Sequence, residues 1–288
     1  MGIIIILATL LASCGLASPV YAQESESITG QWTIEPVVSQ DNQVKLALER
    51  RTPQTTWITT INTPVEKLIG LTMGQMAGSN SSVRFELKRD AGTFTCEGKF
   101  DGGKGTGTFV FSANPDFSKQ LSALGYSNLS NERIFEMALY VTTTFVRDLK
   151  SLGYSDVPVS QLIPMRVHKI STDFIGELQA LGYKDVPIDQ LIPMRIHGVS
   201  IDYVRGLKHL GYANVPPEQL VSMRIHGVSI EYIKELKALG YDQVLVSQLI
   251  SMVIHKVTPD FIRKAKERSQ TAPPVEELIR MRIRGRFN

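Results

Sequence analysis

The sequence predicts an α+β protein of two domains: a small antiparallel β-sheet domain, either a meander sandwich or a partial barrel, and then an αα-solenoid of six helical repeats. Short β-branched and aromatic runs separated by turn residues occupy residues 28–112, which is typical of an antiparallel meander of six strands. An aromatic residue then recurs through residues 113–288 with steps of 28, 29, 29, 29 and 29 residues. The recurring aromatic residues are Phe117, Phe145, Phe174, Tyr203, Tyr232 and Phe261.

Residues 1–22 have the features of an export signal. An apolar run from Ile3 to Leu11 is followed by small residues up to Ala22, where a signal peptidase is expected to cleave. An alternative is that the stretch ending at Cys14 is a bacterial lipobox, in which case Cys14 becomes the lipidated first residue. Both interpretations predict an exported protein, periplasmic or extracellular, and the second adds a lipid anchor in the membrane.

The β domain contains one cysteine and one short motif that invite functional interpretation. The chain has 2 Cys, so once Cys14 is removed or acylated, Cys96 has no partner within the chain and is predicted to be a buried core thiol. Gly30-Gln31-Trp32 matches the Gly-x-Trp that opens lipocalin barrels. Ligand barrels of that type need eight strands, so Trp32 is predicted to be a core or rim aromatic. A small-molecule or lipid site in the β domain is the alternative.

Each repeat is predicted to form two short helices. Phe174, Leu178 and Leu181 are spaced to lie on one face of a first helix, and Gly182 is placed to end it. The second helix follows, with Pro193 expected to bend or shorten it. The residues of this helix expected to point inward are Leu191, Ile192, Ile196 and Val199. Short helices are marginal alone, so stacking between neighbouring repeats is expected to stabilise them.

Two rows of recurring polar residues in the second helices are candidate partner-binding positions. An arginine row offers planar donors to carboxylates or phosphates, or pairs with acids of the next repeat such as Asp202, Glu231 and Asp260. A histidine row lies near the helix ends, where it complements the helix dipole. Equivalent residues of stacked helices lie about 9 to 10 Å apart, too far for one metal ion, so no metal site is predicted. The candidate residues are Arg166, Arg195, Arg224, His168, His197, His226 and His255.

The charge distribution limits the classes of partner. A net charge of +3 does not fit a dedicated nucleic-acid binder, so none is expected as a partner. The last repeat is locally basic and could contact an anionic membrane or envelope polymer. The basic residues of this repeat are Arg263, Lys264, Lys266, Arg268, Arg280, Arg282, Arg284 and Arg286.

The repeats carry two sequence blocks, LGY and MRIHGV, and follow a β-rich segment with Gly-x-Trp near its start. In these features residues 28–288 resemble the exported helical-repeat accessory module appended to some BlaR/MecR-type membrane metallopeptidases of bacteria. The peptidase HExxH motif is missing, so the resemblance implies the accessory module alone, without its metal or its chemistry.

No reaction signature occurs in the sequence: G-x-S-x-G, the P-loop, the dinucleotide fingerprint and CxxC are all missing. The sequence therefore predicts a non-catalytic module without cofactors that binds or scaffolds proteins of the bacterial cell envelope. Its expected partner is an envelope protein or an extended peptide, while the oligomeric state is left open. An envelope hydrolase is the least favoured alternative.

Overall fold

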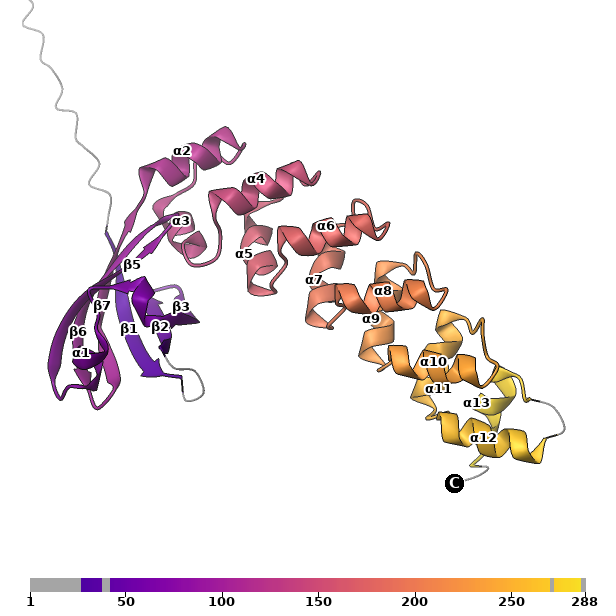
Figure 1. The fold of residues 1–288 in the computed structure, drawn as a ribbon. Helices are drawn as coiled ribbons and strands as arrows, with labels where there is room; N and C mark the ends of the chain where they lie inside the picture. Colours follow the sequence, from indigo (N-terminus) through magenta and orange to yellow (C-terminus); the bar gives the residue numbers. More distant parts are fainter. Residues whose placement is uncertain (1–26, 38–41, 270–271, 286–288) are drawn as a thin grey trace, which may run out of the picture.

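A computed structural model describes residues 27–37, 42–269 and 272–285. The fold is α+β, with an antiparallel half-barrel sheet followed by a series of short helices (Figure 1). The predicted signal peptide (residues 1–22) and Cys14 lie outside the described residues. Among the helices that are described, none combines the length and the apolar character needed to cross a bilayer.

The sheet consists, within the described residues, of seven strands. They are β1 (Ile28–Pro36), β2 (Gln43–Arg51), β3 (Thr56–Pro64), β4 (Leu68–Ile69), β5 (Ser81–Arg89), β6 (Gly92–Asp101) and β7 (Lys104–Ala113). The strand order is β3-β2-β1-β7-β6-β5-β4. The first and last strands therefore pair, from Ile28 opposite Phe111 to Ile34 opposite Gly105. The six-strand prediction omitted β4, which lies in the chain between the 3-10 helix Val65–Lys67 and α1 (Met73–Ala77).

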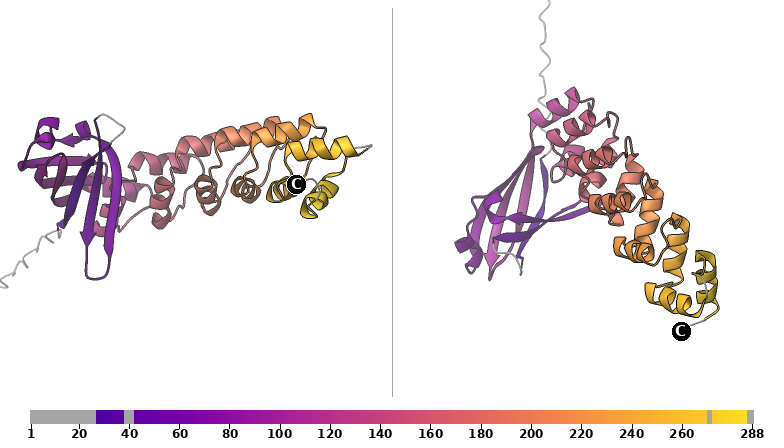
Figure 2. Two further views of the ribbon diagram at one scale, coloured as in Figure 1. Left: turned by 90° about the horizontal axis from the view of Figure 1, so that it is seen from below. Right: turned by 45° about the vertical axis from the view of Figure 1, so that its right-hand side comes forward.

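Helices follow the sheet in pairs. They are α2 (Pro115–Ala123), α3 (Asn131–Met137), α4 (Thr143–Ser151), α5 (Val159–Val167), α6 (Thr172–Ala180), α7 (Ile188–Ile196), α8 (Ile201–His209), α9 (Pro217–Ile225), α10 (Ile230–Ala238), α11 (Val246–Ile254), α12 (Pro259–Arg268) and α13 (Val275–Ile283). Even-numbered helices pack on the next even-numbered helix, and from α5 onward odd-numbered helices pack on the next odd-numbered one. The result is two parallel rows that extend away from the sheet (Figure 2).

Trp32 anchors the interior of the half-barrel. The residue is 1% exposed, and its indole N–H donates to the Glu97 carbonyl at 3.2 Å. Its ring lies 5.0 Å from that of Phe85 and 5.9 Å from that of Phe100. A Cβ on Gly98 would lie 2.7 Å from the indole, so glycine is needed there for this close approach. Trp32 is thus a core aromatic, as predicted.

Helix α3 fills the inside of the half-barrel next to this core. Phe135 is fully buried, and its ring centroid lies 4.7 Å from that of Trp57, 6.0 Å from Phe94, 6.1 Å from Phe109 and 5.4 Å from Phe111. Aromatic clusters of this kind bury a large apolar area and favour defined ring geometry. Helix α3 is therefore part of the β-domain core.

Polar contacts reinforce the junction between the sheet and the helices. Arg50 lies over the Phe135 ring, 5.5 Å from its centroid, and forms an ion pair with Glu132 of α3. The Asp90 carboxylate accepts from the Thr143 backbone N–H at 2.6 Å and from the Thr143 hydroxyl at 2.9 Å. These contacts, with the aromatic cluster, fix the helices against the sheet.

Local signals for the helix ends are confirmed, whereas the expected shortening at Pro193 and the expected inward direction of Ile196 are wrong. Gly182 takes a φ of +106° directly after the C-cap of α6, as predicted. Helix α7 runs through Pro193 for nine residues, the same length as α9, so the proline does not shorten it. Ile196 points outward and is 53% exposed, because it lies two residues after the buried Met194 and therefore on the opposite side of the helix.

Candidate partner-binding surface

The predicted arginine row is folded onto aromatic rings. The guanidinium carbon of Arg166 lies 4.9 Å from the centroid of Phe145, and that of Arg195 lies 4.8 Å from Phe174. Further pairs repeat this geometry at 4.9 Å for Arg224 on Tyr203 and 5.3 Å for Arg282 on Phe261. Each of these four arginines thus stacks on the aromatic of the first helix of its own repeat, a favourable cation–π arrangement.

The same arginines are half-buried between neighbouring repeats. Arg166 Nε donates to the Tyr140 carbonyl at 3.1 Å, whereas Arg195 Nε and Arg224 Nε are buried and have no hydrogen-bond partner in the described part of the chain. The Arg224 guanidinium lies against Gly198, in the turn of the preceding repeat, where a Cβ would be 3.4 Å from Nη2.

The acids proposed as partners for the arginines pair elsewhere. Among the described ion pairs, Asp202 binds Arg205 at 2.8 Å, Glu231 binds Lys234 at 3.7 Å and Asp260 binds Arg263. These pairs lie within single helices, at i and i+3. The arginines of the row are therefore held by stacking on aromatic rings, and not by the ion pairs that the sequence suggested.

The predicted histidine row occupies helix C-caps. His168, His197, His226 and His255 are the C-cap residues of α5, α7, α9 and α11. The middle two are exposed and the outer two half-buried. Within the described residues, no group of histidines, cysteines and acids is placed to hold a metal ion.

Between the arginines and the histidines lies an exposed row of aliphatic residues that sequence reasoning missed. We call it the aliphatic row. Its members are each the last residue of a second helix, so they recur at the period of the repeat. They are Val167, Ile196, Ile225, Ile254 and Ile283, which are 49%, 53%, 54%, 50% and 61% exposed. The signal was available in the sequence, since these positions recur directly after the arginine row and out of phase with the buried Leu and Met positions.

The lysine column of the first helices has a structural role. Lys237 Nζ donates to the Leu210 carbonyl at 2.9 Å, and Lys266 Nζ donates to the Leu239 carbonyl at 3.0 Å. Each accepting carbonyl belongs to the C-cap of the preceding first helix. Lysine at this position satisfies a carbonyl left free at a helix end.

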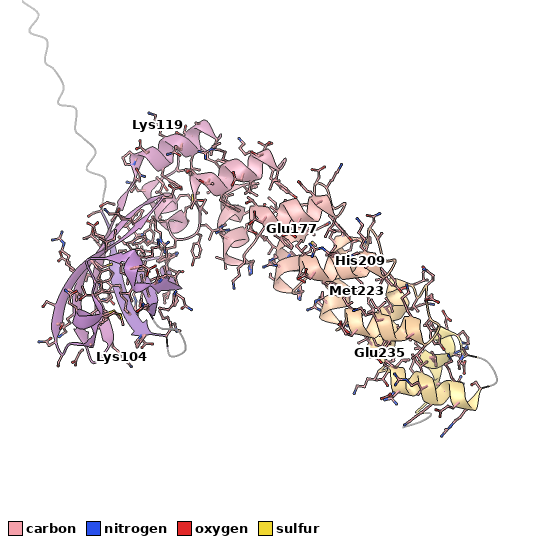
Figure 3. All side chains as sticks on the ribbon, viewed as in Figure 1. Lys104, Lys119, Glu177, His209, Met223 and Glu235 are labelled. Atoms are coloured by element: carbon pink, nitrogen blue, oxygen red, sulfur yellow. The ribbon has the colours of Figure 1, made fainter. Side chains whose placement is uncertain are left out.

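Much of the charge of the basic last repeat is also engaged. Arg263 pairs with Asp260 and Glu235, Arg280 pairs with Glu277 at 2.9 Å, and Arg282 stacks on Phe261. Arg286 lies outside the described residues. Figure 3 marks Glu177 and Glu235 on the first-helix row, where each pairs with an arginine of the next first helix.

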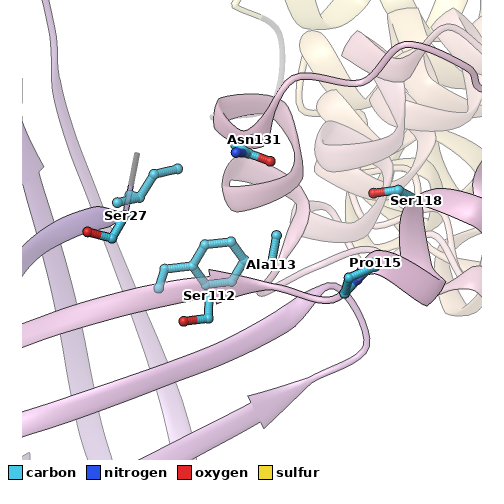
Figure 4. A pocket seen from close by; sticks show the side chains of 8 residues that line it. Ser27, Ser112, Ala113, Pro115, Ser118 and Asn131 are labelled. Carbon is cyan, nitrogen blue, oxygen red and sulfur yellow. The ribbon is translucent and has the colours of Figure 1, made fainter. Parts of the chain in front are cut away.

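A pocket of about 390 Å³ lies where β7, α2 and α3 meet (Figure 4). Ser112, Ala113, Pro115, Ser118 and Asn131 contribute to its lining, and none of its lining residues is titratable. The lining therefore offers hydroxyl and amide groups but no titratable acid or base.

Comparisons with known protein families, with curated proteins and with solved structures find no match to this chain.

Proposed function

We propose that this chain is an exported, non-catalytic interaction or scaffolding module of the bacterial cell envelope, whose helical part binds a protein partner. The observation that carries the proposal is the aliphatic row: five aliphatic side chains, each about half exposed, at one position of five successive second helices. Apolar surface gathered in this way is typical of interaction sites, whereas single exposed aliphatic residues are common everywhere.

We further propose that the helical part, 113–288, is an αα-solenoid of six repeat units. Recurring bonds between units support this organisation. The LGY tyrosines donate to a carbonyl of the next unit, as Tyr154 does to Val186 at 2.7 Å and Tyr183 to Val215 at 2.9 Å. A solenoid held together in this way presents equivalent side chains as a rigid, regularly spaced row, which suits an elongated partner.

The resemblance to the accessory module of BlaR/MecR-type proteins is part of this proposal, as is export. The β domain has a supporting role in it, because its interior is filled by aromatic side chains from the sheet and by Phe135 of α3. The half-barrel then serves as the end piece on which the first helix pair is built.

Affinity capture from envelope extract tests this function. The bait is the chain from Gln23, compared with a variant carrying Ile196→Ser, Ile225→Ser and Ile254→Ser. Leu245→Ser is the matched control, because Leu245 is 63% exposed in the same helical part but lies at the N-cap of α11, outside the row. The expected result is one defined protein, retained by the bait and by the control and lost with the triple variant.

The captured protein is then purified and titrated against all three baits. Equal binding by the triple variant, at unchanged thermal stability, would remove the aliphatic row as the functional surface. Mass spectrometry of the mature protein tests export in the same preparation: a chain starting at Gln23, or an acylated one starting at Cys14, is expected, and an intact Met1 contradicts it.

A further inference from the structure

Basic side chains flank the aliphatic row within each second helix and the turn after it. The nearest acids begin the following first helices, where Asp202, Glu231 and Asp260 are paired with Arg205, Lys234 and Arg263. The stretches 161–171, 190–200, 219–229, 248–258 and 278–285, which run from within each second helix to the turn after it, contain no Asp or Glu. The basic residues in these stretches are Arg166, His168, Lys169, Arg195, His197, Arg224, His226, His255, Lys256, Arg280, Arg282 and Arg284. The row is therefore an apolar strip along a cationic edge.

Acids of the same helices lie at the other end. Asp189, Glu218 and Glu276 occupy the first turns of α7, α9 and α13, whereas the aliphatic row ends those helices. A partner lying along the row thus meets positive charge, and its own complementary charge is negative.

The spacing of the row limits the conformation of the partner. Neighbouring packed helices lie about 8 to 10 Å apart, which sets the distance between successive row members. A polyproline-II segment returns a side chain to the same face every three residues, about 9.3 Å along its axis. A β-strand returns one every two residues, after only about 6.6 to 6.8 Å, and so loses register within two helices.

We propose that the aliphatic row binds an acidic, extended peptide segment in the polyproline-II conformation, with an aliphatic residue at every third position. The inference rests on the proposed function and names its partner class. Each step along the row then corresponds to one turn of such a segment. Aliphatic side chains of the peptide lie between successive row members, and its carboxylates face the histidines and the lysines that follow two of them, Lys169 and Lys256, both exposed.

A second copy of this chain is a less suitable occupant, because rows laid directly on each other bring two cationic edges together. An amphipathic helix is also less suitable. It inserts its apolar face into a groove, whereas the row consists of single side chains projecting from helix ends.

Fluorescence anisotropy with synthetic peptides tests the inference. The probe is a labelled peptide of five Leu-Pro-Glu triplets. One comparison peptide has five Leu-Pro-Lys triplets, and another has the composition of the probe with the leucines at irregular spacing. The proteins are the chain from Gln23, the double variant Ile196→Ser with Ile225→Ser, and the Leu245→Ser control.

The expected result is that the Leu-Pro-Glu peptide binds the unaltered chain and the control equally, and about tenfold more tightly than either comparison peptide. Affinity is expected to fall about tenfold in the double variant and to weaken with added salt. The inference is overturned by equal affinity for the lysine or irregular peptide, by no effect of the double variant, or by no binding. A dimer of the unaltered chain, seen in sedimentation and lost in the double variant, would overturn it in favour of self-association.

The two proposals fail separately. Partner capture that depends on the row, together with peptides that bind indiscriminately, leaves the proposed function intact and removes the peptide inference. Capture that is independent of the row removes the proposed function itself.

Discussion

At the scale of single residues, the recurring arginines show how one side chain stabilises a repeat. Arg195 is held by Phe174 below its guanidinium plane, 4.8 Å from the ring centroid, while its Nε is buried without a hydrogen-bond partner in the described residues. The aliphatic stem and the ring stacking are therefore its stabilising contacts, because Nε donates no hydrogen bond within the described residues.

Arg195→Ala is expected to lower the free energy of unfolding by about 1–2 kcal/mol, because it removes both the stacking and the packed stem. Arg195→Met keeps the stem and removes the unpartnered Nε, so its cost is expected to be less than half as large. Urea denaturation followed by circular dichroism measures both. Equal costs for Ala and Met would show that the charge alone matters.

The buried tyrosines make stability sensitive to alkaline pH. Burial raises the pKa of Tyr203 to about 12, although Arg224 opposes the shift, and burial also raises the pKa of Tyr232. An unfolded tyrosine titrates near pH 10, so above that pH the unfolded state has lost protons that the folded state retains. The free energy of unfolding is therefore expected to fall as the pH rises from about 10 to 12.

Urea denaturation across this pH range measures the effect, and Tyr203→Phe provides the control. The variant removes one of the groups with a raised pKa, so its stability should fall less steeply with pH. An identical slope in both proteins would mean that Tyr203 titrates alike when folded and unfolded.

At the scale of helices and strands, the C-cap carbonyl of each first helix from α2 to α10 accepts a hydrogen bond from a side chain of the next repeat. The chain offers its own comparison, since Gln179 donates to the Leu152 carbonyl at 2.9 Å where the other repeats use lysine. Either donor satisfies the carbonyl at the C-cap, so what the position requires is a hydrogen bond from a long side chain.

Lys237→Met is expected to lower the free energy of unfolding by about 0.5–1.5 kcal/mol, because the Leu210 carbonyl loses its donor. Lys237→Gln is expected to lower the free energy of unfolding by only a few tenths of the loss caused by Lys237→Met, because glutamine also supplies a donor to the Leu210 carbonyl. Thermal and urea unfolding of the two variants decide between this and a purely electrostatic role, which would make Gln and Met equally costly.

Helix α3 connects the sheet to the helical part, so substitution of its buried residue Phe135 should destabilise both. Phe135→Ala is expected to cost about 3–5 kcal/mol, since the ring is fully buried among aromatic neighbours. Hydrogen exchange should then show loss of protection in β2, β3 and α3 together. Phe135→Leu is the matched variant, with a smaller loss expected. Loss of protection limited to α3 would contradict its role as part of the β-domain core.

Local signals in the sequence predicted the elements well. Gly182 follows the C-cap of α6 with a φ of +106°, and Cys96 is a buried free thiol whose pKa burial raises to about 12. These features depend on neighbours in the chain or on strand alternation, so a local pattern reveals them.

Contacts between distant residues were missed. The insertion of Phe135 against Trp57 joins segments that lie far apart in the sequence, so no local pattern signals it. The arginines of the row were expected to bind carboxylates or phosphates, but Arg195 stacks on the aromatic ring of the first helix in its own repeat. Ile196 was expected to point inward because its side chain is apolar. Its position on the helix relative to the buried Leu191 and Met194 directs the side chain toward solvent.

At the scale of the whole molecule, the half-barrel and the helical rows form one elongated body. The even-numbered helices make a continuous row beside the odd-numbered row, and both lead away from the sheet (Figure 2). Because α3 belongs to both parts, the helical rows are held in a fixed direction from the sheet. The last residues of successive second helices therefore keep a fixed arrangement. A single partner can then contact all five members of the aliphatic row.

Site-specific photo-crosslinking in the exporting cell tests this claim most directly. A photoreactive phenylalanine analogue is placed, one position at a time, at Ile196, Ile225 and Ile254, and at the exposed but off-row positions Ile58 and Leu245. The account predicts that the same partner is crosslinked from all three row positions and from neither control. Crosslinks to that partner from Ile58 or Leu245, with none from the row, would contradict it.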